Sequence, residues 1–261
     1  QQLKDFSFEM KRGCAANGGG SDLIFIDSRK QLYSQFVNRN LVLKAAMRNA
    51  KHSSFCVESG DSKFLDIKAN DETIINEIIT AYLALPSRDG QQQRVQKTSV
   101  QLKTILEYES AHGFAANSVL IPRAIRREGK VYLSENPVFV STNFVVCSTQ
   151  RFRDALLLST WISTIFYQLI CEVASKDEEG MRKMEVNDIR LTFVPKMENI
   201  PDSVINELSQ ETHTLSFIDL KSPKIRNVDC IWARYLFRDN YKDKLNEATR
   251  LLSFLANRRN N

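Results

Sequence analysis

The sequence predicts an α+β fold: a mixed sheet with a central buried helix and C-terminal helices. Strand-like and helix-like segments do not alternate regularly, which argues against a doubly wound α/β fold. The segment 151–173 is apolar on most sides, as expected for a helix at the centre of a fold. The 261 residues are 43% hydrophobic and 26% charged, which is enough to build a core without disulfides or a metal.

The individual elements follow from periodicity and from turn residues. Strands are predicted at 22–27, 54–58, 63–67, 118–122, 130–133, 138–147 and 189–195. The pair 54–58 and 63–67 flanks Ser59-Gly60-Asp61-Ser62 and predicts a hairpin. Helices are predicted at 29–48, 71–85, 151–173, 202–210 and 229–257, the last with a break near Asp239 and Asn240. The polar segment 87–97 is interpreted as an exposed loop or a helix start.

The best domain boundary lies at 222–228. Residues 1–228 then form one domain, and 229–261 form a C-terminal helical appendage that packs on it. No apolar run reaches eighteen residues, so we expect no membrane span and no membrane partner. Five cysteines without a CxxC pair indicate a reduced, cytoplasmic protein. The chain begins without methionine, so we expect a piece of a longer polypeptide.

Basic charge is concentrated in two stretches. The net charge is +5, whereas the segment 88–130 alone carries +4 and the segment 229–261 carries +3. The other residues therefore sum to a negative charge. This distribution is compatible with a polyanionic partner, although a solvated charged face is the more common reason for such a pattern.

Motifs for nucleotide binding and catalysis are missing from the sequence. It contains neither GxGxxG nor GxxxxGK[ST], and its three glycines at 18–20 precede a strand-like segment instead of following one. The histidines His52, His112 and His213 are isolated, and nothing marks a nucleophile elbow. We therefore predict no catalytic residue, no metal ligand and no cofactor in this chain.

One pattern supports an alternative, a Mg²⁺-dependent endonuclease. Asp66 and Lys68 stand at positions i and i+2 at the end of a predicted strand, so both side chains would point to one face. The carboxylate would bind Mg²⁺ and the lysine would assist the attacking water. This tripeptide is common by chance, and a solvated strand end is the more frequent explanation.

Two basic loops are candidates for nucleic-acid contact. The segment 121–132 places four basic residues between two strand-like runs, punctuated by Pro122 and Gly129. The segment 178–185 follows the central helix and contains Gly180 and an Arg-Lys pair. Such loops present arginine and lysine to phosphates or to guanine edges, although solvated turns have the same composition.

Taken in order, several segments resemble the target-recognition (specificity) domains of type II and fused restriction-modification DNA adenine-N6 methyltransferases. The resemblance spans about 11–195 and rests on the order of motifs that are individually degenerate. It is carried by Lys11-Arg12-Gly13-Cys14-Ala15-Ala16-Asn17 with the strand 23–26, by 119–123 with Arg126, Gly129, Val131 and Tyr132, by 138–144, by Trp161-Ile162-Ser163-Thr164 with Gln168-Leu169, and by 179–185 with Asp188-Ile189 and Val194-Pro195. The terminal helices also resemble those that close such domains.

This resemblance implies a sequence-specific module for double-stranded DNA that lacks the catalytic domain. A separate methyltransferase domain in the same parent chain would flip and methylate adenine with S-adenosylmethionine, and would need Mg²⁺ if the parent also cleaves DNA. The catalytic [N/D]PP[Y/F] motif is absent here, since no Pro-Pro pair occurs. The residues expected to contact DNA are Lys11, Arg12, Asn17, Arg123, Arg126, Arg127, Lys130, Asn143, Arg182 and Lys183.

The segment 51–101 does not align with this family pattern. A third hypothesis is a protein-interaction subunit whose terminal helices dock a partner. Binding DNA no better than other basic proteins do, at any salt concentration, would favour that hypothesis over the DNA-binding module.

Overall fold

The computed structural model of the chain describes residues 2–5, 9–14, 23, 25, 30–85, 98–178 and 180–259. The strands are β1 (Glu9–Arg12), β2 (Leu43–Met47), β3 (Ser62–Leu65), β4 (Phe114–Ala115), β5 (Ser118–Pro122), β6 (Ala124–Ile125), β7 (Glu128–Gly129), β8 (Tyr132–Ser134), β9 (Val138–Val140), β10 (Phe144–Ser148), β11 (Lys176–Glu178), β12 (Met181–Lys183) and β13 (Ile218–Asp219). The α-helices are α2 (Lys30–Ser34), α3 (Glu72–Leu83), α4 (Ser99–His112), α5 (Phe152–Ser163), α6 (Ile165–Ala174), α7 (Val186–Arg190), α8 (Asp202–Glu211), α9 (Asn227–Phe237) and α10 (Tyr241–Arg258).

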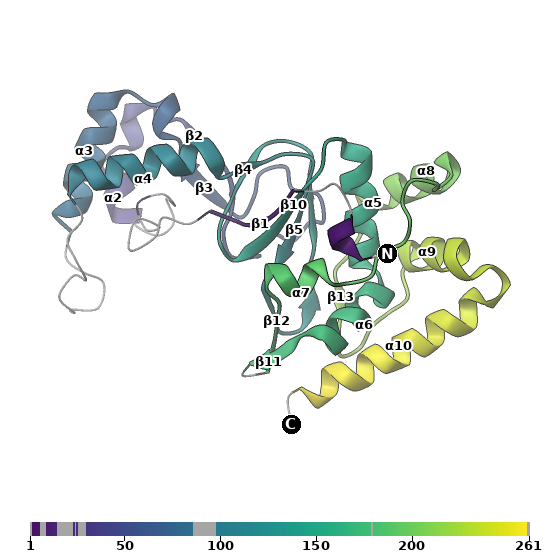
Figure 1. Ribbon diagram of the computed structural model, residues 1–261. Helices are drawn as coiled ribbons and strands as arrows, with labels where there is room; N and C mark the ends of the chain where they lie inside the picture. The colour runs from purple at the N-terminus through teal and green to yellow at the C-terminus, as the bar shows by residue number, and fades with distance from the viewer. Residues whose placement is uncertain are drawn as a thin grey trace.

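These elements form a main body with a smaller lobe beside it, in the predicted α+β class (Figure 1). The main sheet has the order β1-β10-β5-β8, and every pair in it is antiparallel. A second sheet, β3-β2-β9-β4, contains the parallel pair β2–β9 and is therefore mixed. The smaller lobe consists of α2, α3 and α4 packed beside β2 and β3.

Strand β5 lies at the centre of the core because both of its faces are covered. Val119 and Ile121 belong to the apolar cluster that includes α5, whereas Leu120 points to the opposite face and packs with Tyr132 and Phe144. All five residues of β5 are buried. The sequence of a strand that is covered on both faces is a continuous apolar run, and the sequence of β5 has this character.

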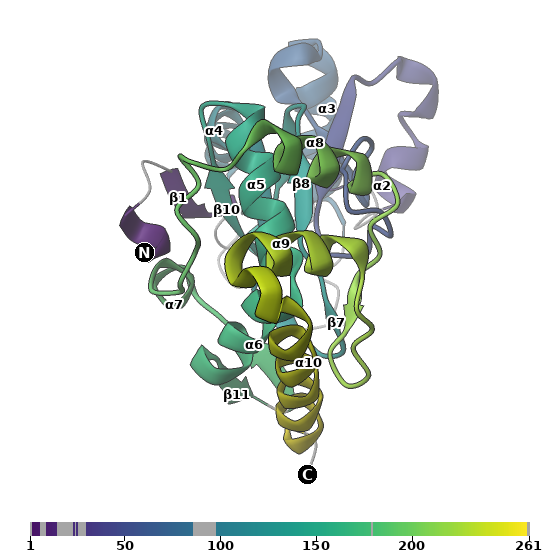
Figure 2. The same ribbon diagram turned by 90° about the vertical axis from the view of Figure 1, so that its right-hand side faces the viewer.

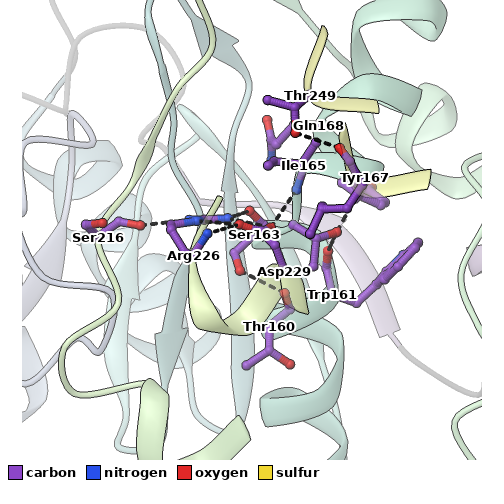
Figure 3. A network of polar contacts seen from close by, with 12 residues as sticks. Thr160, Trp161, Ser163, Ile165, Tyr167, Gln168, Ser216, Arg226, Asp229 and Thr249 are labelled. Atoms are coloured by element: carbon purple, nitrogen blue, oxygen red, sulfur yellow. Dashed lines mark hydrogen bonds and ion pairs between the residues drawn. The ribbon is translucent and has the colours of Figure 1, made fainter. Parts of the chain in front are cut away.

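The predicted central helix is present but is broken at Thr164. Helices α5 and α6 meet at an angle of 69°. Asp229 from α9 stabilises the start of α6, since its Oδ1 accepts a hydrogen bond from the Ile165 amide at 2.9 Å. Arg226 pairs with the same carboxylate and also donates to the Ser163 carbonyl (Figure 3). This contact therefore ties α9 to the junction between α5 and α6.

The C-terminal helices lie over the central pair. Figure 2 shows α9 and α10 on the side that faces the viewer, with α10 running beside α6. Trp232 of α9 is fully buried in the main cluster, and Leu245 and Leu252 of α10 pack against Ile165. The predicted division of the chain at Val228 stays a prediction.

No single helix among the described residues is both long and apolar enough to cross a membrane. Helices α5 and α6 reach that length and hydropathy only as a bent pair, and α5 is buried in the core.

Several predicted elements are confirmed. The helix at 71–85 is α3, and its N-cap is Asp71, whose side chain accepts from the Thr73 amide. The strand 118–122 is β5 and the helix at 202–210 is α8. The break near Asp239 is also present, as a short 3-10 helix (Arg238–Asn240) between α9 and α10.

Other predictions were wrong. The helix at 29–48 ends early, because 43–47 form β2 and pair with β3 and β9. The 54–58/63–67 hairpin does not form, since β3 pairs with β2. The strand at 189–195 is replaced by α7 and an irregular segment. The strand at 138–147 splits at the turn 141–143, and its halves join different sheets.

Helix α4 was not predicted. The predicted segments 22–27, apart from Leu23 and Phe25, and 87–97 lie outside the described residues.

Candidate nucleic-acid interface

A hollow of about 490 Å³ lies on the main body where three distant segments meet. It is lined by Asn49, Ala50, Pro122, Ala124, Ile125, Arg126, Arg127, Glu128, Lys130, Phe217 and Asp219. Three of the predicted DNA-contacting residues, Arg126, Arg127 and Lys130, are in this set. The structure thus brings the basic loop that follows β5 to the edge of a concave surface.

The shape of this loop follows from short strand pairings on both sides. Strand β6 pairs with β12, and β7 pairs with β13. Glycine is needed in β7, because a Cβ at Gly129 would lie 2.6 Å from Cγ2 of Ile218. These pairings fix the backbone of 124–129, so the turn side chains 126 and 127 point into solvent.

The three basic side chains of the hollow differ in how they are held. Arg126 is exposed, and its guanidinium has no hydrogen bond or ion pair within the described part of the chain. Arg127 is 72% exposed and pairs with Asp219 at 2.7 Å. The hydrogen bond from Arg127 holds the pKa of the Asp219 carboxyl below its ordinary value. Lys130 is largely covered and donates to the Ala50 carbonyl at 3.2 Å.

A second basic group lies around the turn 141–143. The carbonyl of Thr142 accepts from Arg12 Nε at 3.3 Å and from Arg123 Nη1 at 3.0 Å. Arg123 also forms a two-point pair with Glu185, one contact of which is Nε to Oε2 at 3.1 Å. This hydrogen bonding lowers the pKa of Glu185, and the positive charges of Arg12 and Lys183 lower it further. Arg123 is only 14% exposed, so most of its hydrogen-bonding capacity is used within the fold.

Asn143 connects the turn to the loop after β2. Its Nδ2 donates to the Arg48 carbonyl at 2.7 Å and to Asn49 Oδ1 at 3.3 Å. Both amide hydrogens are therefore used inside the protein. Asn143 therefore has no free donor for a base edge in this conformation, and its contact with bases stays a prediction that only its side-chain oxygen could meet.

Arg182 also differs from its prediction. It is 3% exposed, and its guanidinium binds Gln168 Oε1 at 2.6 Å and Glu172 Oε1 at 3.2 Å. Because successive strand residues point to opposite faces, Arg182 points inward from β12 while Lys183 points to the other side. Arg182 is therefore a structural cation, not a DNA contact in this conformation.

The remaining predicted residues lie elsewhere. Lys11 is partly exposed on β1 and pairs with Glu9 at 3.2 Å. Asn17 lies outside the described residues. For Lys11, Arg12, Arg123, Arg126, Arg127, Lys130 and Lys183, contact with DNA stays a prediction.

The nuclease alternative loses its geometric basis. Strand β3 ends at Leu65, and Lys68 lies in a 3-10 helix that begins after Asp66. The Asp66 carboxylate caps this helix through the Lys68 amide and pairs with Lys44 at 2.6 Å. Asp66 is 4% exposed. In the described part of the chain, no three His, Cys, Asp or Glu side chains are grouped as a metal site requires.

Sequence reasoning missed one side of the hollow. The loop 48–51 and the segment 217–219 contribute Asn49, Ala50, Phe217 and Asp219. Neither segment carries a motif, and each is separated from the loop 122–130 by about 70 residues or more. The pairing of β2 with β9 and of β13 with β7 brings them to the loop.

Comparison with known proteins confirms the class that the resemblance implied, a specificity domain. The chain belongs to the family described as "Restriction endonuclease BpuSI, specificity domain", whose model matches residues 11–225. A solved structure, the type IIG restriction endonuclease BpuSI, is 29% identical and superimposes with a TM-score of 0.86. The match covers 99% of this chain and 31% of that enzyme. No curated protein matches the chain.

Proposed function

We propose that this chain recognises a specific sequence in double-stranded DNA. The observation that carries the proposal is the hollow beside β5, where the exposed Arg126 and Arg127 stand at the edge of a concave surface. Membership of the specificity-domain family supports it. A concave surface with exposed guanidinium groups suits a duplex, because arginine binds phosphates and also guanine edges through two parallel hydrogen bonds.

The two basic groups would have different tasks. Arg12, Arg123 and Lys183 surround Glu185 and are held by protein partners, so they suit a fixed electrostatic surface for the phosphate backbone. Arg126 is free of described partners and suits a contact that forms only when DNA is present. Register on the duplex would come from the first group and sequence discrimination from residues in the hollow.

We propose further that the parent protein is a restriction-modification enzyme that works in the bacterial cytoplasm. A separate domain of the same chain would carry out adenine-N6 methylation with S-adenosylmethionine, and Mg²⁺ would be needed if the parent also cleaves DNA. This chain spans 31% of the BpuSI enzyme that it resembles, which leaves room for such domains in a parent of similar length. Its own task would be binding without chemistry.

The test is a fluorescence-anisotropy titration of a randomised duplex library at two salt concentrations, followed by sequencing of the bound fraction. We expect affinity to fall steeply with salt and a short motif to be enriched. Arg126→Ala should weaken binding. Arg234→Ala is the matched control, because Arg234 is also exposed but pairs with Glu207 between α8 and α9. Absence of binding at low salt would contradict the proposal and favour a protein partner.

A further inference from the structure

The carboxylate of Asp61 binds the backbone of residues 48–51, the loop that follows β2. Asp61 accepts backbone hydrogen bonds from Arg48 at 2.6 Å, Asn49 at 3.2 Å and Lys51 at 2.7 Å. Three amides that point at one carboxylate define the path of the loop closely.

Gly60 places this carboxylate. It has a φ of +70°, and a Cβ there would lie 2.2 Å from the carbonyl oxygen of Ala46. This close approach lets the Asp61 amide donate to the same Ala46 carbonyl at 2.9 Å. The chain at 60–61 is thus fixed against the end of β2, directly beside the loop.

The loop is also held from the side of the hollow. The single proton of the Tyr132 hydroxyl is shared between the carbonyls of Ala50, at 2.9 Å, and His52, at 3.1 Å. Lys130 donates a further hydrogen bond to Ala50 at 3.2 Å. Ala50 itself has a φ of +53°, which is uncommon for a residue with a Cβ. The backbone polar groups are turned inward, whereas the Asn49 side chain remains exposed at the hollow.

The orientation of the Asn49 amide is set by Asn143. The group of Asn143 that faces the Arg48 carbonyl must be Nδ2, because a carbonyl only accepts. The second hydrogen on this Nδ2 points to Asn49 Oδ1 at 3.3 Å. Asn49 Nδ2 has no hydrogen-bond partner within the described part of the chain, so both of its hydrogens and one lone pair of Oδ1 are available to a ligand. One donor and one acceptor side by side match the N7 and N6 groups of adenine in the major groove.

We infer that Asn49 is a specificity-determining residue that reads the major-groove edge of an adenine, and that Asp61 and Asn143 are its positioning residues. This inference rests on the proposed function, because it names one base contact within the recognised sequence. It assigns a role to a loop in which no motif is present. It also explains why Asn143 has its donors turned toward the protein.

The test compares Asn49→Ala with the unaltered 261-residue chain in the same library selection. We expect the variant to lose preference at one A·T pair, by about 5- to 150-fold in relative affinity, while the other positions of the motif are kept. The dependence on salt should not change, since asparagine carries no charge. Asn246→Ala on α10 is the matched control, and thermal melting of each variant checks that it is folded.

Asn143→Ala tests the positioning role. It should relax the same A·T position without changing the salt dependence, which a general loss of stability would not do. If Asn49→Ala selects the unchanged motif with unchanged preference, or loses preference at a G·C pair instead, the inference is overturned and the proposed function stands. If the unaltered chain selects no motif, the proposed function fails and the inference fails with it.

Discussion

Arg259, just beyond the last turn of α10, donates from Nη2 to the backbone carbonyl of Arg126, 3.4 Å away. Its Nη1 lies 3.3 Å from the carbonyl of Ile125, and its Nε lies 2.9 Å from Glu172 Oε2. Glu172 also pairs with Arg182 from β12. The end of the C-terminal helix is therefore attached, through a buried charged cluster, to the turn that carries the exposed arginines of the hollow.

This attachment predicts that Arg259→Ala loosens the turn 124–127. We expect faster amide hydrogen exchange there, a loss of about 1–3 kcal/mol in the free energy of unfolding, and weaker DNA binding. Glu172 keeps Arg182 as a partner, which limits the cost of removing Arg259. Hydrogen exchange followed by mass spectrometry measures the effect segment by segment.

Arg258→Ala is the control for this experiment. Arg258 is the neighbouring residue, is exposed, and lies over the ring of Phe254 at 5.5 Å. It should leave exchange at 124–127 unchanged. Equal effects of the two substitutions would show that the contact between Arg259 and the turn has no particular role.

The pair between Arg127 and Asp219 predicts substitutions of opposite effect. Asp219→Asn removes a negative charge from the hollow and releases Arg127, so we expect DNA to bind several-fold more tightly with a salt slope steeper by about one. Arg127→Gln should weaken binding and flatten the slope by a similar amount. Stability should change little, since Arg127 is largely exposed and water screens its pair with Asp219. Anisotropy titrations at several salt concentrations give both slopes.

Glu207→Gln is the control for that pair, because Glu207 also binds a single exposed arginine, Arg234. It lies on α8, outside the lining of the hollow. If it raises affinity as much as Asp219→Asn does, the gain is a matter of net charge and not of the site.

Sequence patterns correctly predicted the elements that neighbouring residues determine. Helix α3 has its cap at Asp71 and an apolar stripe, and β5 is a short apolar run bounded by Pro122. The prediction of a helix over 43–47 failed because the strand there depends on pairing with β3 and with β9, the latter more than 90 residues away. The periodicity of a short segment carries no information about a distant partner strand. The predicted hairpin of 54–58 and 63–67 failed for the same reason, because β3 pairs with β2 instead.

The site residues also divide into those that a local pattern predicts and those that depend on distant segments. Arg126, Arg127 and Lys130 were found because they stand together in one loop. Arg182 was misplaced because an Arg-Lys pair on a strand sends one side chain inward, and the sequence does not say which. Asn49 was missed because its surroundings, Asp61 and Asn143, come from two other segments.

The packing of α9 predicts that the C-terminal helices unfold with the rest of the main body. Trp232 is fully buried, and its Nε1 donates to Thr160 Oγ1 at 3.3 Å. The centroid of its ring lies 5.5 Å from that of Trp161. Trp232→Ala should cost about 3–5 kcal/mol. Urea unfolding should show one transition at lower denaturant, with no separate early step for α9 and α10.

Leu251→Ala is the comparison for Trp232, because Leu251 is an apolar residue on α10 that is 37% exposed. We expect it to cost about 1 kcal/mol or less. If Trp232→Ala instead releases only the helical signal of 229–261 and leaves the sheet intact, the two parts are separate cooperative units, as the predicted appendage would be.

The buried carboxyl of Glu109 on α4 predicts a pH dependence of stability. Glu109 is 3% exposed, and its Oε2 has no hydrogen-bond partner in the described part of the chain. Burial raises the pKa of this carboxyl, while a hydrogen bond with Cys14 and the charge of His112 oppose the rise. The folded protein therefore favours the protonated form more than the unfolded chain does.

The stability that Glu109 contributes is therefore complete below the ordinary carboxyl pKa, near 4.5, and is lost as pH rises through the folded pKa. Glu109→Gln stays neutral and avoids this loss. We expect the variant to match the unaltered protein at pH 4 and to exceed it at pH 8 by on the order of 1 kcal/mol in the free energy of unfolding. Denaturant titrations across this range measure the difference. A gap that stays constant with pH would mean that Glu109 does not change protonation on folding.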